Sequence, residues 1–248
     1  MEVKKVRDLS LITIDDNNTM VIACDSSGSI GMKKGDVLKV SPFIVGKFAA
    51  RVVLLEVICS GAQVVTIADG VCDEMNPTGE GIISGIRSEL ALADIKDIVL
   101  TGSTEENFDT ISTGIGIIAV GIGYSKKLKI NNVKHEAAVI SVGLPKVGNE
   151  VISAKGSEIV DYKTIYKMLK NDLIYEIVPV GSKGIAYEAA QLARNNGLIL
   201  NLESKQNIDI KRSGGPSTSV IAAIDFQCID DILDTVPEVN VIGYLKKN

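Results

Sequence analysis

Runs of apolar residues in the first half of the chain predict five strands. Each run is rich in β-branched residues and stops at turn residues such as Gly, Asp or Ser, a pattern typical of strands. The predicted strands cover residues 19–25, 36–40, 63–70, 97–103 and 113–123.

Two helices are expected between these strands. Ser41 and Pro42 supply an N-cap followed by proline at the first helical position, and a mostly apolar stretch then covers residues 43–59. The second helix is expected to open at Asn76 and Pro77. Its apolar residues recur at helical spacing, at Ile82, Ile83, Ile86 and Leu90.

A polar segment, residues 124–136, precedes a second series of elements. A strand resumes at residue 137 and leads into a loop rich in Gly and Pro. Helices are predicted over residues 161–170 and from an N-cap at Ser182 through Arg194, with Asn196 and Gly197 closing the second one. The remaining strands are expected at residues 173–180, 198–202, 217–224 and 239–245.

Both halves mix strands and helices, so we predict an α+β fold in which mixed sheets pack against helices. A length of 248 residues permits one large domain or two small ones. We place a boundary near Lys134, which gives an N-terminal domain of residues 1–134 and a C-terminal domain of residues 135–248.

Composition narrows the class of protein. With 46% apolar and 23% charged residues, the chain is expected to be soluble and globular. A net charge of −5, 4% aromatic residues and the absence of Trp argue against nucleic-acid binding. No run approaches the roughly 18–20 apolar residues that a membrane-spanning helix needs. The basic start, MEVKKVRDLSLITI, alternates in polarity, so we expect no signal peptide and a cytoplasmic protein.

The four cysteines are far apart in the sequence, at Cys24, Cys59, Cys72 and Cys228. No CxxC pair occurs, and His135 is the single histidine, so the closely spaced ligands of a structural zinc site are missing. Buried thiols in a reducing compartment are the expectation.

A Gly/Ser-rich loop after the first predicted strand is the first candidate for chemistry. Asp25 ends the strand, Lys33 and Lys34 lie in the loop, and Asp36 opens the next strand. Glycines such as Gly28 let backbone N–H groups approach an anion, and two aspartates suit a hard cation such as Mg²⁺. The alternative is an ordinary turn with solvated charges.

Three further segments carry polar groups in unusual places. Glu56 lies in an apolar stretch, where an ionised carboxylate is costly unless a metal or a partner such as Arg51 compensates it. Residues 100–114 crowd hydroxyl, amide and carboxylate groups at a strand end, and KRSGGPSTS at residues 211–219 joins two cations to paired glycines. Residues 100–114 suit phosphate and metal contacts but also an ordinary polar loop, and residues 211–219 suit either an anion-binding turn or a rigid entry into the next strand. No GxxxxGK[ST] occurs, so a nucleotide would not be held by a P-loop.

The order of these motifs resembles the N-terminal domain of the aminoimidazole ribonucleotide synthetase superfamily. The shared features are Asp-x-x-Gly after a strand, a helix ending in an acidic residue before Gly-Ala, and a strand running into a Gly-[Gly/Ser]-x-Thr-like motif. VGLPKVGNEV, PVGSKGIAYEAAQLA, SGGPSTSVIAAI and VNVIGYL resemble its C-terminal domain. Members include thiamine monophosphate kinase, selenophosphate synthetase and a hydrogenase maturation factor.

A narrower resemblance is to the alpha-ribazole kinase branch, and RDLSLI and TGSTEEN are its specific strings. It implies phosphoryl transfer from ATP to the ribose 5′-hydroxyl of alpha-ribazole, a salvage step towards the lower ligand of cobalamin. It also implies Mg²⁺ as a cofactor, a nucleoside substrate and a homodimer, with ATP and Mg²⁺ at the N-terminal domain near the subunit junction.

By the same resemblance, Asp25 matches a metal-binding aspartate, and Glu56 stands where relatives carry a metal-binding aspartate before Gly-Ala. Ser103 and Thr104 fall near the nucleotide phosphates. The chain departs from the pattern at Pro179, where many relatives have an acidic residue. It also lacks the His that follows the first aspartate in several relatives, and its segment before the first strand is short.

We therefore predict Mg²⁺ bound by Asp25, Asp36 and Glu56, with Glu105 or Glu106 as the general base. Asp69 is a further candidate, but a solvated turn aspartate before Gly70 is the preferred interpretation of this residue. The residues expected to contact ATP are Gly28, Lys33, Lys34, Arg51, Gly102, Ser103 and Thr104. Two alternatives remain open: another ATP-dependent enzyme of the superfamily, such as a thiamine monophosphate kinase, and a catalytically silent nucleotide-binding protein.

Overall fold

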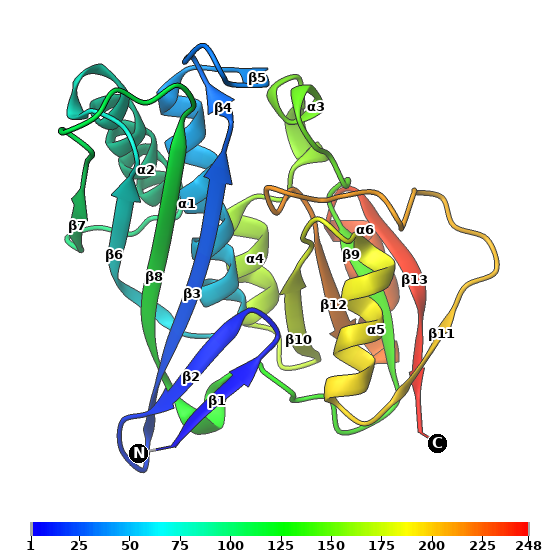
Figure 1. Ribbon diagram of the computed structural model, residues 1–248. Coiled ribbons are helices and arrows are strands. Elements are labelled where there is room, and N and C mark those ends of the chain that lie inside the picture. The colour runs from blue at the N-terminus through cyan, green and yellow to red at the C-terminus, as the bar shows by residue number, and fades with distance from the viewer. Residues whose placement is uncertain (1, 248) are drawn as a thin grey trace. The chain divides into compact units, whose positions relative to one another are not determined.

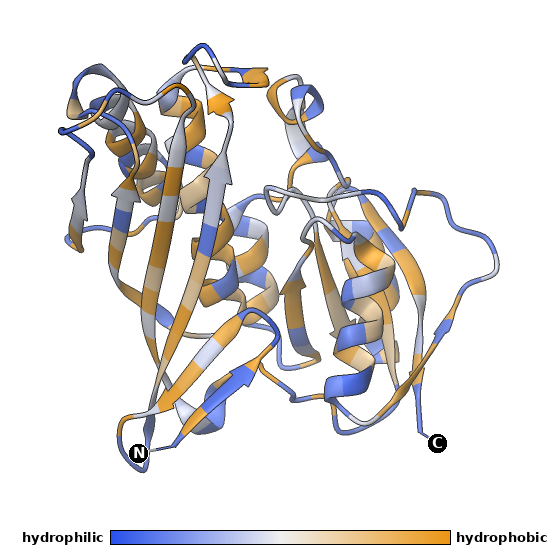
Figure 2. Ribbon diagram, in the orientation of Figure 1, coloured by the Kyte–Doolittle hydropathy of each residue, from blue (hydrophilic) through white to orange (hydrophobic). Residues whose placement is uncertain are grey.

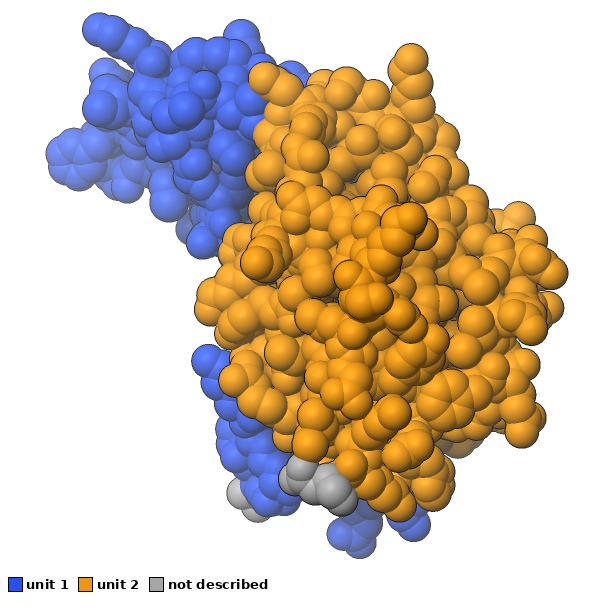
Figure 3. Space-filling model, turned by 90° about the vertical axis from the view of Figure 1, so that its right-hand side faces the viewer, with its two compact units in different colours: residues 1–58, 62–126 blue, residues 59–61, 127–248 orange. Residues whose placement is uncertain are grey.

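The computed structural model describes residues 2–247, which form two compact units (Figure 3). The first unit comprises the chain up to Ile58 together with Ala62–Lys126. The second comprises Cys59–Gly61 and the chain from Lys127 onward. The domain boundary that we placed near Lys134 remains a prediction.

Six strands form the main sheet of the first unit, in the order β1-β2-β3-β8-β6-β7 (Figure 1). Neighbours are antiparallel except β6 and β7, which run parallel. The strands are β1 (Val3–Val6), β2 (Leu9–Thr13), β3 (Asn18–Gly28), β6 (Gln63–Val71), β7 (Val99–Ser103) and β8 (Gly114–Tyr124). A short parallel pair, β4 (Ile30–Gly31) and β5 (Leu38–Lys39), follows β3.

One face of this sheet is covered by α1 (Pro42–Cys59) and α2 (Glu80–Leu92) (Figure 1). Strand β8 is apolar along most of its length (Figure 2). Because side chains alternate between the faces of a strand, Ile117 and Ala119 are fully buried while Ile118 is 37% exposed on the other face. The alternation therefore separates a buried core face from an outer face on which some apolar side chains are exposed.

The two helices approach each other closely at glycines. A Cβ on Gly46 would lie 1.9 Å from the carbonyl oxygen of Ile82, and one on Gly85 would lie 2.0 Å from that of Phe43. Only glycine permits this contact. The same helices are joined by a buried ion pair between Arg51 and Glu89 at 3.5 Å.

The second unit contains an antiparallel sheet in the order β10-β12-β9-β13-β11. Its strands are β9 (Ala137–Val142), β10 (Ile174–Pro179), β11 (Ile199–Leu202), β12 (Val220–Ile224) and β13 (Val239–Lys246), and its helices are α3 (Asn149–Ile152), α4 (Tyr162–Leu169), α5 (Ile185–Asn195) and α6 (Ile229–Thr235). Every residue of β9 and β12 is buried, as expected for central strands covered on both faces.

Most predicted elements are confirmed, among them the helix over 43–59 and the strands that became β3, β6, β7 and β8. The opening of the second helix at Asn76 was wrong. The residue before a proline is driven to extended backbone, and Asn76 has φ −119° and ψ 118°. A short π-helical segment (Met75–Gly79) therefore precedes α2, which starts at Glu80.

Three other details differ from the prediction. The helix expected to be capped by Ser182 is capped by Gly184, whose φ of +82° favours glycine. The strand over 36–40 shrinks to β5 because Asp36 closes a turn, in which its N–H donates to the carbonyl oxygen of Lys33 at 3.1 Å. The hairpin of β1 and β2 was not predicted.

The cysteine expectation was half right. Cys59 and Cys228 are buried, but Cys24 and Cys72 are exposed, and all four are free thiols. Within residues 2–247, no helix is both long and apolar enough to cross a membrane.

Candidate functional site

Polar loops gather at one end of the sheet in the first unit. Strands β3 and β6 are both antiparallel to β8, and β7 is parallel to β6, so the C-terminal ends of β3, β6 and β7 meet the start of β8. The register pairs Gly28 with Gly114 and Gly70 with Ser103 at this edge. The loops that follow β3, β6 and β7 are thereby brought together.

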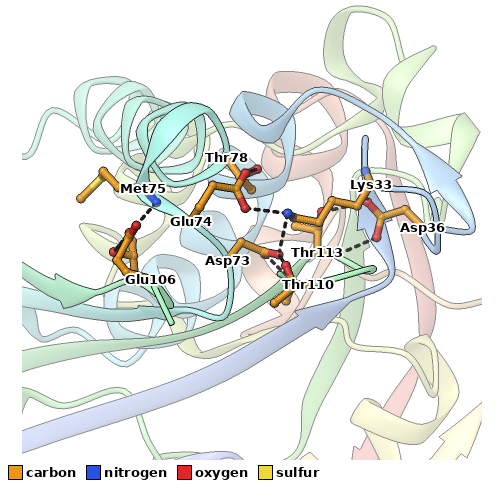
Figure 4. A network of polar contacts seen from close by, with 11 residues as sticks. Lys33, Asp36, Asp73, Glu74, Met75, Thr78, Glu106, Thr110 and Thr113 are labelled. Carbon is orange, nitrogen blue, oxygen red and sulfur yellow. Dashed lines mark hydrogen bonds and ion pairs between the residues drawn. The ribbon is translucent and has the colours of Figure 1, made fainter. Parts of the chain in front are cut away.

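Lys33 joins two of these loops (Figure 4). Its Nζ lies 2.6 Å from Oε2 of Glu74 and 3.5 Å from Oδ1 of Asp73. Asp73 is fully buried, and its carboxylate also accepts hydrogen bonds from the hydroxyl of Thr110 and, at 3.0 Å, from the backbone N–H of Gly114. Two carboxylates of the β6 loop therefore converge on one ammonium group.

The pKa values of this pair favour the charged forms. The hydrogen bond to Glu74 raises the pKa of Lys33. Burial opposes ionisation of Glu74, but hydrogen bonds from Lys33 and Thr78 outweigh it and lower the pKa of Glu74 to about 2. At neutral pH the network contains an ammonium ion and ionised Glu74.

Asp36 organises the loop after β3. Its carboxylate accepts hydrogen bonds from N–H of Thr113 at 2.7 Å, the hydroxyl of Thr113 at 2.8 Å and N–H of Lys33 at 2.8 Å. Burial would raise the pKa of Asp36, but these hydrogen bonds outweigh it and lower the pKa. Because both oxygens are engaged, Asp36 ties the Lys33 loop to the start of β8, and its metal-binding role stays a prediction.

The loop after β7 carries the two predicted general bases. Oε1 of Glu106 accepts hydrogen bonds from N–H of Met75 at 2.8 Å and from the hydroxyl of Thr104 at 2.7 Å (Figure 4). Glu105 accepts the N–H of Asn107 at 2.6 Å, and this bond is the main cause that lowers the pKa of Glu105. The structure thus gathers Thr104, Glu106 and the β6 loop.

A cavity of about 330 Å³ lies beside these loops. It is lined by Lys33, Glu74, Glu105, Glu106, Asn107, Phe108, Asp109 and Thr110. This lining includes four carboxylates and one ammonium group. A phosphate would therefore enter this cavity favourably only together with further cations.

Asp25 and Asp69 lie in one row of the sheet, on either side of Ile117. Asp25 of β3 and Asp69 of β6 are both paired with Ile117 of β8, so the three side chains point to the same face. Burial raises the pKa of both aspartates, and the charge of Asp8 raises that of Asp25 further. Their backbones are two strand spacings apart, about 10 Å, so a shared ion would need a bridging ligand such as a phosphate.

The donor set at this end fits a magnesium–nucleotide complex. Mg²⁺ is usually held by one or two carboxylates and by substrate phosphates. Asp25 and Asp69 supply two carboxylates, and burial disfavours the charged form of each. A positive ion near these carboxylates, bridged to them through a phosphate where necessary, would offset that cost.

Several other predicted residues lie apart from this network. Arg51 is buried in its pair with Glu89, and half-buried Glu56 lies on α1. Lys34, Gly28, Gly102 and Ser103 are exposed at the loop end of the sheet. Among residues 2–247, no group of three or more His, Cys, Asp or Glu side chains is arranged to hold a metal ion. The convergence of Asp25, Asp36 and Glu56 on one Mg²⁺ is therefore not seen in this structure.

Sequence reasoning missed Asp73, Glu74, Thr110 and Thr113. A signal for the first two was present, because an acidic pair lies in the short segment between the strand over 63–70 and the Asn76-Pro77 pair. The two threonines lie in a segment whose polar composition alone did not distinguish them from other loop residues.

Solved structures match this chain over nearly its whole length. PurL from T. maritima, solved with ADP, has a TM-score of 0.72 at 13% identity over 100% of this chain and 43% of PurL. AaThiL, solved with AMPPCP and TMP, has a TM-score of 0.68 at 13% identity, covering 97% of this chain and 85% of AaThiL. Thiamine-monophosphate kinase from Stenotrophomonas maltophilia K279a has a TM-score of 0.63 at 14% identity, covering 99% and 89%.

These matches confirm the predicted fold class, since the chain shares the fold of PurL and of thiamine-monophosphate kinase. The chain spans less than half the length of PurL. No family model matches the sequence, and no curated protein sequence matches it.

Proposed function

We propose that the chain is an ATP-dependent kinase that phosphorylates the ribose 5′-hydroxyl of alpha-ribazole. The observation that carries the kinase reaction is the gathering of Lys33, Asp73, Glu74 and the Asp25–Asp69 row at one end of a sheet. This arrangement occurs in a fold shared with AaThiL, which was solved with AMPPCP and TMP.

The choice of alpha-ribazole is supported by the strings RDLSLI and TGSTEEN. Thr104 and Glu106 of the second string hydrogen-bond to each other, and Glu105 and Glu106 line the cavity beside Lys33. The first string contains Asp8, whose charge acts on Asp25. Both strings that are specific to the alpha-ribazole kinase branch therefore contribute residues close to the proposed site.

In this reaction a bound Mg²⁺ would neutralise charge on the phosphates. Asp25 and Asp69 would hold the ion, and Lys33 would pair with a phosphate oxygen. Glu105, whose pKa is lowered by the hydrogen bond from the N–H of Asn107, would accept a hydrogen bond from the acceptor hydroxyl and orient it. Glu106 is the alternative candidate for the general base.

A thiamine monophosphate kinase is the second candidate, favoured by the structural likeness to AaThiL and to the S. maltophilia enzyme. An ADP-release assay with Mg-ATP decides between the two when alpha-ribazole, thiamine monophosphate and no acceptor are compared. We expect turnover that depends on alpha-ribazole. Turnover with thiamine monophosphate alone would select the second candidate, and ATP binding without turnover on either acceptor would indicate a silent nucleotide-binding protein.

We also propose a cytoplasmic homodimer. Free cysteines, two of them exposed, suit a reducing compartment. The outer face of the main sheet keeps apolar groups exposed, with Ile118 and Ile122 of β8 each 37% exposed and Val65 of β6 38% exposed. A second copy that covers this face would bury them.

A further inference from the structure

The Lys33 ammonium group occupies the point on which two carboxylates converge (Figure 4). Nζ lies 2.6 Å from Oε2 of Glu74 and 3.5 Å from Oδ1 of Asp73. The lysine side chain is 17% exposed and that of Asp73 is fully buried, so the contact is largely removed from water. Both Lys33 and Glu74 line the cavity of about 330 Å³, so the point is open to a ligand from that side.

The carboxylates are held in place by groups other than Lys33. Oε1 of Glu74 accepts a hydrogen bond from the hydroxyl of Thr78 at 2.5 Å. Oδ2 of Asp73 accepts the N–H of Gly114 at 3.0 Å, and Oδ1 also accepts the hydroxyl of Thr110. Departure of the ammonium group would therefore leave two ordered oxygen ligands facing one point.

The lysine backbone is also anchored independently of its side chain. Asp36 accepts the N–H of Lys33 at 2.8 Å and is itself bonded to Thr113. The four methylene groups of lysine can consequently carry the ammonium group elsewhere while the loop stays where it is.

We propose that Lys33 stands in for a divalent cation in the ligand-free protein, and that Mg²⁺ replaces its ammonium group between Asp73 and Glu74 and frees it to pair with a phosphate. The inference rests on the proposed kinase function for the identity of the phosphate. Two carboxylates suffice for this ion, because Mg²⁺ keeps several waters and completes its octahedron with substrate phosphates. The site is separate from Asp25 and Asp69, which lie within the sheet.

Charge balance explains why such an exchange would couple the two ligands. Lys33, Asp73 and Glu74 together carry a charge of −1 when all three are ionised, and addition of a dication changes this to +1. Because Glu105, Glu106 and Asp109 also line the cavity, its lining stays negative, but an anion is repelled less strongly once the dication is bound. Metal and nucleotide should therefore each increase the affinity for the other by the same factor.

The test is Mn²⁺ binding, followed by the electron paramagnetic resonance signal of the free ion, without nucleotide and with AMPPCP. In Lys33→Met we expect Mn²⁺ alone to bind about 10-fold more tightly than to the wild type, because a competing positive charge is gone. The same variant should bind AMPPCP more weakly. Glu74→Gln should weaken Mn²⁺ binding by about 10-fold or more, since a charged oxygen ligand is lost.

Two further variants control the measurement. Lys33→Arg keeps a positive charge and should retain the weak Mn²⁺ binding of the wild type. Glu80→Gln changes an exposed carboxylate that is hydrogen-bonded to Asn76, outside the network, and should leave Mn²⁺ affinity unchanged. If Lys33→Met does not fold, as judged by circular dichroism, the Glu74→Gln result decides.

Unaltered or weakened Mn²⁺ binding in folded Lys33→Met, or unaltered binding in Glu74→Gln, would overturn the inference. These outcomes are distinguishable from failure of the kinase proposal, which the acceptor assay reports separately. Turnover of alpha-ribazole with unaltered Mn²⁺ affinities would refute the exchange and leave the kinase standing. The expected Mn²⁺ affinities without turnover on any acceptor would support the exchange and refute the kinase proposal.

Discussion

At the scale of single residues, the charged groups of the first unit fall into two kinds. Lys33, Glu74 and Asp36 are compensated by partners at 2.6–2.8 Å, and hydrogen bonds lower the pKa of both carboxyl groups despite their burial. Asp25 and Asp69 show the opposite behaviour, because burial raises their pKa. A partly buried carboxyl group whose pKa is raised by its burial is a frequent mark of a functional position.

Replacing Asp25 by Asn tests this contrast. A group whose pKa is raised in the folded state destabilises the protein when it is ionised. The variant should therefore have a higher Tm than the wild type at neutral pH in metal-free buffer, and its kinase turnover should fall at least about 100-fold. A lower Tm with normal turnover would show that Asp25 is a structural residue; Tm and ADP release are the two measurements.

The ion pair of Lys33 and Glu74 predicts a pH dependence of stability. The pKa of Glu74 falls from 4.5 to about 2 on folding, so its stabilisation is complete above pH 4.5 and is lost as the pH falls towards 2. Glu74→Gln should have a lower Tm than the wild type at pH 6, and the difference should shrink as the pH approaches 2. Glu80→Gln is the matched control, and a difference in Tm for Glu74→Gln that does not vary with pH would contradict the assignment.

At the scale of elements, the packing of α1 against α2 positions the loops of the site. Gly46 and Gly85 allow the helices to touch through their backbones, and α2 follows directly on the turn that carries Thr78. Thr78 in turn holds Glu74. Displacement of α2 would therefore move one of the carboxylates that contact Lys33.

Gly85→Ala should destabilise the first unit by about 1–3 kcal/mol, the usual cost of overpacking a core. The added Cβ would meet the carbonyl oxygen of Phe43 at 2.0 Å and the backbone nitrogen of Lys47 at 2.6 Å. Gly116→Ala is the control, because its Cβ would have no atom within 4 Å. Equal free energies of unfolding for the two variants, measured in urea, would refute the close contact.

Elements marked by a long apolar run or a hydrophobic period could be predicted from the sequence, whereas features set by long-range contacts could not. The run over 43–59 became α1 because burial on nearly every side matches its apolar composition. Asp25 and Asp69 were proposed as metal ligands partly from their places at strand ends, and this role stays a prediction. The pairing of Lys33 with Glu74 joins residues 41 positions apart, and no local pattern reports it. Arg51 was predicted to contact ATP. Its ion pair with Glu89 could not be foreseen, because only the fold shows which side of α2 packs against α1.

At the scale of the whole molecule, the two compact units have different sheets. The main sheet of the first unit carries helices on one face and exposed apolar groups on the other, whereas the central strands of the second are buried throughout. The candidate site belongs to the loop end of the first sheet. The uncovered face of that sheet is where a second copy would be expected.

Ile118→Asp tests the proposed homodimer. A charge at this position would have to be buried in the interface, so the variant should be monomeric while the wild type is dimeric, as measured by size-exclusion chromatography with light scattering. Ile14→Asp changes a residue that is 46% exposed between β2 and β3 and should leave the dimer intact. A wild-type monomer, or an Ile118→Asp dimer, would exclude this face as the interface.

The most direct test of the account is a crystal structure of the protein grown with AMPPCP and Mg²⁺. We predict that the triphosphate lies over the loop end of β3, β6 and β7, with metal density between its oxygens and the carboxylates of Asp25 and Asp69. A triphosphate bound elsewhere on the chain, or bound here with no ion near either aspartate, would contradict the proposed mechanism.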